Sequence, residues 1–139
     1  PHAGELAALL NRLGQIASRS EVEADPEAAA LLAAKLTDCQ VVLKGNINRM
    51  ASPNQKVRAL GPMSAHLATA GTGDVLAGAL AALLAANHVV VLESEEVFLD
   101  VIELAVELHS RAAELASHDG PVSALDVAES LRKAIAEIS

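Results

Sequence analysis

Apolar residues recur at helical spacing along most of the chain. Leu6, Leu9, Leu10 and Leu13 form one apolar face, which predicts a short helix that ends near Gly14. The same spacing predicts further helices over residues 26 to about 38, about 74 to 86, and 95 to 118, and a last helix capped by Ser123. In that last helix we expect these residues to face inward: Leu125, Val127, Ala128, Leu131, Ile135 and Ile138. Asp119-Gly120-Pro121 is expected to end the long helix before it.

Between the second and third of these helices the pattern changes from periodic to continuous. Residues 41–45, Val-Val-Leu-Lys-Gly, are typical of a strand buried on both faces of a parallel sheet. Residues 49–52 and 56–60 flank the turn signal Pro53-Asn54-Gln55 and predict a hairpin. Residues 20–25 are expected to form a polar connector, and the apolar patch 88–92 is compatible with a loop or an edge segment.

Composition narrows the class of protein. A chain of 139 residues is long enough for one domain, or for part of one, with a real core. Aromatic residues make up only 1% and Phe98 is the sole ring, so aliphatic side chains must build that core. A net charge of -8 argues against nucleic-acid binding, which needs clustered cations. Cys39 stands alone, which excludes a disulfide framework and makes a reducing cytoplasm the default expectation.

No targeting or membrane segment is expected. Pro1 is not an initiator residue, and no charged and apolar leader opens the chain. The longest apolar tract, residues 75–92, contains Gly78, Asn87 and His88, which fits a buried helix better than a membrane span.

The stretch Gly71-Thr72-Gly73-Asp74 carries the most suggestive chemistry. Its glycines allow a tight turn whose amide groups, together with the positive end of the following helix, can hold an anion. Asp74 at that rim can accept a proton from an attacking hydroxyl. The alternative is an ordinary turn with an acid at a helix start, which the pattern alone does not exclude.

Two further residues are candidates with bland alternatives of their own. Lys44 lies at the carboxyl end of the predicted strand, where ligands gather in open α/β sheets, although a solvated lysine fits the position equally well. His2 stands at a loop before the first helix, where a surface histidine is the simpler interpretation. Neither standard phosphate-loop pattern is present, nor is a His/Cys metal motif. A glycine-rich anion loop with an acid and a lysine suits phosphoryl transfer.

Three segments, in order, resemble the ADP/ATP-dependent NAD(P)H-hydrate dehydratases of the ribokinase-like superfamily. They are Pro-His-Ala-Gly-Glu-Leu at 1–6, Val-Val-Leu-Lys-Gly at 41–45, and Leu-Ala-Thr-Ala-Gly-Thr-Gly-Asp-Val-Leu-Ala-Gly at 67–78. The tail agrees, with His109 where the family usually has a His-Gly pair and residues 121–127 like the family's entry to its last helix. The resemblance therefore covers nearly the whole chain.

The resemblance implies a layered α/β/α fold of roughly twice this length, of which residues 1–139 look like the carboxyl-terminal half, helix-rich with a small sheet. It implies dehydration of hydrated NADH or NADPH with ADP or ATP, and we expect Mg²⁺ to accompany the nucleotide. Asp74 would be the base and a substrate contact, and His2 would touch the hydrated dinucleotide. Residues expected on the phosphate and nucleotide side are Lys44, Gly45, Asn46, Ile47, Asn48, Gly71, Thr72 and Gly73. No metal site built from protein ligands alone is expected.

The chain departs from the family pattern at three positions. Asn46 and Asn48 replace a small residue and a threonine after the strand, and Ser110 follows His109 where a glycine is typical. Two other functions therefore stay open, a ribokinase-like small-molecule kinase and an inactive fragment that only folds and associates. Because a single strand and a hairpin leave sheet edges unpaired, we expect the chain to associate with a missing N-terminal half or with another copy.

Overall fold

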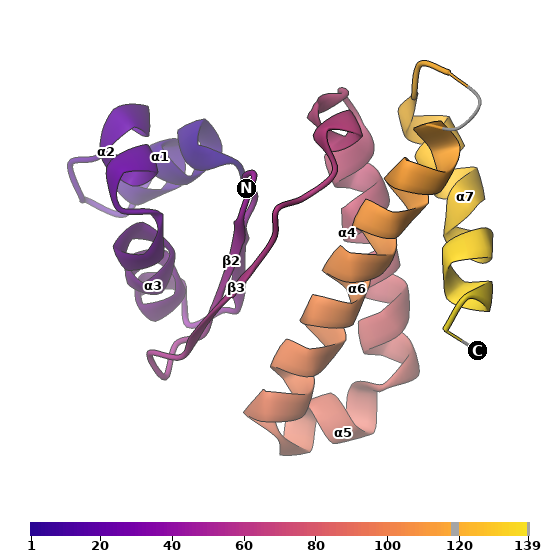
Figure 1. Ribbon diagram of the computed structural model, residues 1–139. Helices are drawn as coiled ribbons and strands as arrows, with labels where there is room; N and C mark the ends of the chain where they lie inside the picture. Colours follow the sequence, from indigo (N-terminus) through magenta and orange to yellow (C-terminus); the bar gives the residue numbers. More distant parts are fainter. Residues whose placement is uncertain (118–119, 139) are drawn as a thin grey trace. The chain divides into compact units, whose positions relative to one another are not determined.

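The computed structural model describes residues 1–117 and 120–138, and the chain divides into two compact units. Unit 1 is Pro1–Met63 and unit 2 is Ser64–Ser139. Each is described by itself below, with its elements labelled as in Figure 1. This division does not test the expectation that residues 1–139 form one domain or half of one, which stays a prediction.

Unit 1 begins with three helices whose starts are all capped by side chains. They are α1 (Ala3–Arg12), α2 (Arg19–Ala24) and α3 (Pro26–Thr37). His2 caps α1 and Ser18 caps α2, each in a reciprocal capping box with a glutamate three residues later. Asp25 accepts a hydrogen bond from the amide of Ala28 and so caps α3, where Pro26 fills the first position. The α1 and α3 predictions are confirmed.

The three-stranded sheet of unit 1 runs in the order β1-β2-β3, with β1 at Val41–Leu43, β2 at Asn48–Ala51 and β3 at Val57–Leu60. The predicted hairpin is confirmed, because β2 and β3 pair antiparallel in the register Asn48↔Leu60 to Ala51↔Val57. The prediction that the strand at 41–45 lies in a parallel sheet is wrong within this unit, because β1 pairs antiparallel with β2. A short loop after β1 returns the chain directly. The parallel contact of this segment is an isolated bridge between His2 and Lys44.

The core of unit 1 lies between its helices and the sheet. Helix α3 packs against β1 and β2, and α1 packs against both α2 and α3 (Figure 1). The buried residues are mostly alanine, leucine and valine, as the near absence of rings requires: Leu6, Ala7, Leu10, Val22, Ala30, Ala33, Ala34, Val41, Leu43 and Ala51. Small side chains on α3 let its backbone approach the strands closely.

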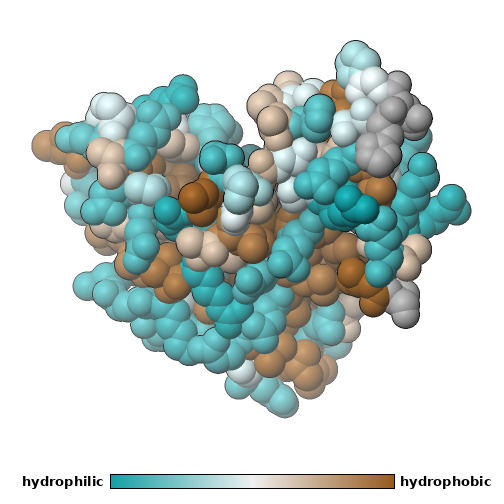
Figure 2. Space-filling view, viewed as in Figure 1, coloured by the Kyte–Doolittle hydropathy of each residue, from teal (hydrophilic) through white to brown (hydrophobic). Residues whose placement is uncertain are grey.

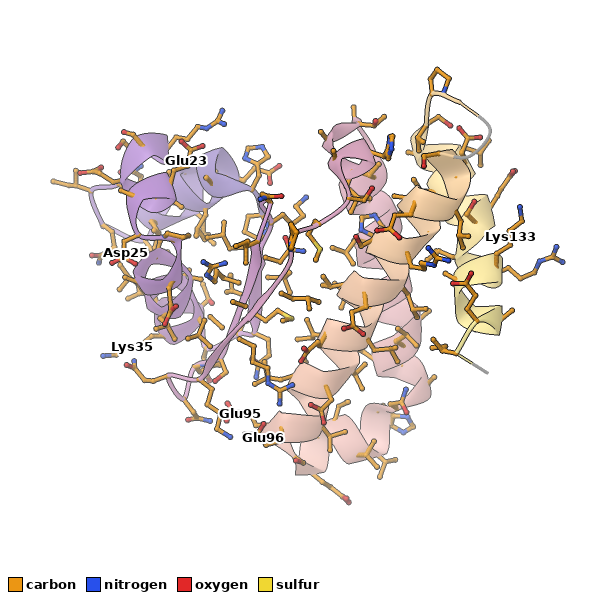
Figure 3. The ribbon with its side chains drawn as sticks, viewed as in Figure 1. Glu23, Asp25, Lys35, Glu95, Glu96 and Lys133 are labelled. Atoms are coloured by element: carbon orange, nitrogen blue, oxygen red, sulfur yellow. The ribbon has the colours of Figure 1, made fainter. Side chains whose placement is uncertain are left out.

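Unit 2 is helical in the residues that the structure describes. It contains the 3-10 helix η1 (Ala65–Ala68), α4 (Thr72–Ala86), α5 (His88–Glu93), α6 (Glu95–Ala116) and α7 (Ala124–Ala136). Helix α6 packs against both α4 and α7 (Figure 1). Buried residues of this core include Leu108, Ala112, Ala113, Val127 and Ala134. Figure 3 shows Glu95 and Glu96 in the first turn of α6 and Lys133 near the end of α7, charges that suit the two ends of a helix dipole.

Two segments predicted to be irregular are helices. Residues 20–25 were expected to form a connector, but residues 20–24 belong to α2, because Ser18 and Glu21 cap each other and Val22 is buried. Residues 88–92, expected as a loop or edge segment, belong to α5, which packs on α4 and α6 with Val91 buried. Tertiary packing overrides the strand preference of a valine run.

The predicted inward face of α7 is only partly correct. Val127 is fully buried, but Leu125, Ile135 and Ile138 are 65%, 47% and 62% exposed. Leu125 lies two residues before Val127, about 200° around the helix, so both cannot face α6. The predicted end of α6 falls partly on residues 118 and 119, which lie outside the described residues.

Hydrophobic surface gathers on α5. Val89, Val90 and Leu92 are 55%, 44% and 81% exposed, and Figure 2 shows hydrophobic side chains at the end of unit 2 where α5 lies. Within residues 1–117 and 120–138, no helix combines the length and the apolar character that crossing a bilayer demands.

Candidate functional site

The turn before α4 is shaped by backbone geometry. Gly71 is the N-cap residue, its φ is 88° in the left-handed region, and no side chain caps the helix start. The amides of Asp74 and Val75 donate to the carbonyl oxygen of Gly71 at 3.0 and 3.3 Å. A side chain at position 71 would also place its Cβ 3.1 Å from the Cβ of Ala124. Glycine is therefore required here by both conformation and space.

Thr72 is committed to the turn. Its side chain is buried, at 3% exposure, and its hydroxyl lies 2.8 Å from the carbonyl oxygens of Leu67 and of Thr69. Because that hydroxyl is buried against these carbonyls, its task is to close the segment before α4. Any part that Thr72 takes in binding a phosphate would come from its place in the first turn, where the helix dipole is positive.

Asp74 is exposed in the first turn of α4. Among the residues that the structure describes, its carboxylate forms no hydrogen bond or ion pair, although other first-turn acids, such as Asp126, are engaged in caps. None of the backbone hydrogen bonds of the turn in this part of the chain uses the N–H of Gly73. The arrangement thus places an accessible carboxylate, which can accept a proton, beside a helix start that has no side-chain cap. This suits a base next to a phosphate.

His2 and Lys44 are brought together within unit 1. Their backbones form a parallel bridge, and the amide of Lys44 donates to the carbonyl oxygen of Pro1 at 2.7 Å. The Nδ1 atom of His2 accepts from the amides of Gly4 and Glu5 at 3.1 and 3.2 Å. Because Nδ1 accepts, the neutral ring carries its proton on Nε2, which can donate to a ligand.

The partner of His2 in this cap is Glu5. One carboxylate oxygen of Glu5 accepts from the backbone amide of His2 at 2.8 Å, and this bond lowers the pKa of Glu5 below its usual value. The other oxygen lies 3.5 Å from Nε2 of His2. Glu5 thus holds both the backbone and the ring of His2.

The loop after β1 holds the other predicted phosphate residues. Gly45, Asn46 and Ile47 are exposed, whereas Asn48 is 5% exposed and accepts from the amide of Gly45 at 2.9 Å. The buried Asn48 side chain therefore fixes the conformation of the loop. The exposed residues before it form the surface that a nucleotide can reach. This is a structural role for Asn48 that its place in the sequence did not suggest.

Two residues near the turn were not predicted as part of the site. His109 of α6 lies with Nε2 2.8 Å from the carbonyl oxygen of Thr72, and the hydroxyl of Ser110 accepts from the amide of Ser64 at 3.0 Å. Both are buried, at 4% and 9% exposure. The sequence signal was the interruption of an apolar helix face by two adjacent polar residues.

No group of three or more metal-binding side chains occurs among the described residues.

Comparison with known proteins assigns the family. The family model described as NAD(P)H-hydrate dehydratase matches residues 1–136. The chain belongs to the NAD(P)H-hydrate dehydratase family. Curated relatives agree with this: the bifunctional NAD(P)H-hydrate repair enzyme of Corynebacterium glutamicum is 32% identical over 153 aligned residues, and covers 99% of this chain. The ADP-dependent (S)-NAD(P)H-hydrate dehydratase of Neisseria meningitidis serogroup B is 39% identical over 85 residues, or 61% of this chain.

A solved structure of the same family name establishes the fold. The ADP/ATP-dependent NAD(P)H-hydrate dehydratase of Bacillus subtilis, co-crystallised with ATP and Mg²⁺ and soaked with CoA, matches the whole chain with a TM-score of 0.79 at 23% identity. The fold is thus the ribokinase-like α/β fold that the sequence resemblance implied. The chain covers 48% of that structure, and 26% and 27% of the two curated relatives.

Proposed function

We propose that this chain carries part of the active site of a nucleotide-dependent dehydratase that acts on hydrated NADH or NADPH. The observation that carries the proposal is the exposed Asp74 carboxylate, without a partner among the described residues, directly after the Gly71 turn in a member of this family. The names of the relatives support the reaction class and the use of ADP or ATP.

The chemistry assigns Asp74 one task. The hydroxyl oxygen of the hydrate forms a bond to the terminal phosphorus of the nucleotide, the bond from that phosphorus to the leaving oxygen breaks, and Asp74 accepts the hydroxyl proton. Phosphate then departs with the electron pair of the carbon–oxygen bond, and a proton lost from the neighbouring ring carbon restores the double bond. The products are NAD(P)H, phosphate and the nucleotide shortened by one phosphate.

Each unit contributes one segment to phosphate binding in this proposal. Gly71, Thr72 and Gly73 provide the positive end of α4 for the transferred group. In unit 1, Lys44 and the exposed residues 45–47 are the proposed contacts of the nucleotide. Bound Mg²⁺ would supply charge neutralisation on the phosphates, held by them and by water rather than by a protein cluster.

His2 is proposed to contact the hydrated dinucleotide as a hydrogen-bond donor. Its Nδ1 is used by the cap of α1, so the ring group proposed for the ligand is Nε2–H, which also lies 3.5 Å from a carboxylate oxygen of Glu5. This assignment makes His2 a binding residue rather than a base.

The decisive experiment replaces Asp74 with asparagine in the full protein. We expect the loss of kcat to be on the order of 10²–10⁴-fold, because the amide keeps the shape of the carboxylate but cannot take the proton. The assay adds ADP or ATP to hydrated NADH and follows the return of NADH absorbance. The matched control is Glu27→Gln, an exposed first-turn carboxylate of α3, which should leave turnover unchanged.

Near-normal turnover in the Asp74→Asn variant would contradict the role of Asp74. Nucleotide consumption by the unaltered protein with a small-molecule acceptor, without any return of NADH, would instead favour the ribokinase-like kinase.

A further inference from the structure

Two adjacent polar residues of α6 contact the two ends of one segment of unit 2. The segment comprises residues 64–72, which include η1 and the turn before α4. Ser110 accepts from the amide of Ser64 at its start, and His109 lies 2.8 Å from the carbonyl oxygen of Thr72 at its end. Helices α4 and α6 pack directly against each other, as Figure 1 also shows.

The contact between His109 and Thr72 has a definite proton arrangement. A carbonyl oxygen only accepts hydrogen bonds, so Nε2 of His109 must carry the proton. Both residues are buried, at 4% and 3% exposure, and a buried polar group without a partner is costly. The bond is therefore maintained in the folded protein and fixes the carbonyl of Thr72 in space.

The segment between the two contacts is also held by backbone hydrogen bonds within it and by the packing of Leu67 on the core of unit 2. Gly71 at the helix start has no side chain, and α4 has no side-chain cap. The hydroxyl of Thr72 lies close to two carbonyls of its own segment, and the hydroxyl of Thr69 donates to the carbonyl of Val122, outside the segment, at 3.3 Å. The contacts from α6 are thus the ones that anchor both ends to a long packed helix.

We propose that His109 and Ser110 are positioning residues that hold the turn at residues 69–73, and through it Asp74, in the geometry for phosphoryl transfer. This inference rests on the proposed function of the turn. Asp74 follows Thr72 by two residues in the same helical turn, so a displacement of the Thr72 carbonyl moves the Asp74 backbone with it. A shift of about 1 Å in a reacting group can cost up to about 100-fold in rate.

The kinetic test compares two substitutions at position 109 in the full protein. His109→Met fills the space without a donor, whereas His109→Gln keeps an N–H near the position of Nε2. We expect kcat to fall roughly 10- to 100-fold in the methionine variant, with the KM for the nucleotide changed far less. Glutamine should restore most of kcat. Equal losses in both variants, or a rise in KM alone, would overturn the positioning role.

A second measurement reads the turn without relying on activity. Amide hydrogen exchange of Thr72 and Asp74, whose N–H groups donate to carbonyls of the turn, should be about tenfold faster in the methionine variant than in the unaltered protein, while amides of α7 exchange as before. Ser110→Ala, which removes one hydroxyl, should do the same at Ser64 and carries the test even if the methionine variant does not fold. Unchanged exchange at Ser64 would contradict the clamp, by which we mean the two contacts that His109 and Ser110 make with residues 64–72.

The two measurements separate this inference from the proposed function. If exchange responds as expected but no form of the protein returns NADH from its hydrate, the clamp stands and the assigned reaction fails. If the unaltered protein is an active dehydratase and neither exchange nor kcat responds to these substitutions, the reaction stands and the clamp fails.

Discussion

Glycine has opposite effects on stability at the N-cap of α4 and in the middle of that helix. Gly71, at its start, is held in a left-handed conformation with the Cβ of Ala124 only 3.1 Å from where its own Cβ would be. Gly78, in the middle of the same helix, has open space around the position of a Cβ and ordinary helical geometry. The first residue is required by the turn, and the second only weakens the helix.

This contrast gives a matched pair of stability predictions. Gly71→Ala should destabilise the protein by about 1–2 kcal/mol, because a left-handed alanine is strained and its Cβ crowds α7. Gly78→Ala should stabilise it by about 0.5–1 kcal/mol through reduced freedom of the unfolded chain. Urea unfolding of both variants checks the signs. Destabilisation of similar size in both would show that the geometry at position 71 is not special.

At the scale of elements, side-chain hydrogen bonds fix where α7 begins and ends. Helix α7 begins with a complete capping box: the carboxylate of Asp126 accepts from the backbone amide and hydroxyl of Ser123, and the amide of Asp126 donates back to that hydroxyl. Further along, Arg111 of α6 donates to Glu137 just after α7. The two ends of α7 are thus both fixed by side chains.

The cap of α7 predicts a dependence of stability on pH. The hydroxyl and then the amide of Ser123 lower the pKa of Asp126 in the folded protein. A depressed pKa stabilises the folded state above the ordinary aspartate pKa of about 3.9, and this contribution is lost as pH falls through the lower folded value. Asp126→Asn should therefore lower the melting temperature at neutral pH and have a diminishing effect on acidification below about pH 4.

The control for this measurement is Glu129→Gln, a carboxylate of the same helix outside the capping box, whose effect should not follow that pH course. If the melting temperatures of Asp126→Asn and the unaltered protein differ by a constant amount from pH 7 to strongly acidic conditions, the cap is not the source of that difference.

At the scale of the whole molecule, local patterns predicted most helices and the hairpin but not the orientation of β1. Periodicity located α3 and α6, and the turn residues at 53–55 located the hairpin. The orientation of β1 escaped prediction because a continuous apolar strand looks alike in parallel and antiparallel sheets. Helix α5 escaped because its valines favour strands in isolation.

In the candidate site, too, the sequence predicted the features that are local in the chain and missed those that depend on packing. Glycine spacing and the acid that follows located the turn at Gly71, because these features are local in the sequence. The contacts of His109 and Ser110 span 37 and 46 residues, so they arise only from the packing of α6 against the turn. Resemblance to the family located His109 but not what it holds.

The sheet of unit 1 predicts association. Within the described residues, β3 has one strand neighbour, and β1 has β2 together with the bridge at Lys44. Because unpaired strand edges leave backbone groups without partners, we expect this chain on its own to form dimers or larger species in sedimentation velocity. A stable monomer over a wide range of protein concentration would contradict this expectation.

The corner between α2 and α3 bears on how the molecule can be labelled. Asp25 ends one helix, with its amide donating to the carbonyl of Glu21, and begins the next through its side chain, so the corner has no spare residue. A tag or fluorophore inserted there would disrupt two helix ends together. The point between Gln15 and Ile16 lies outside the helices instead, with Ile16 98% exposed, and an insertion there interrupts only the loop that the Asn11 side chain closes by two hydrogen bonds to Ala17.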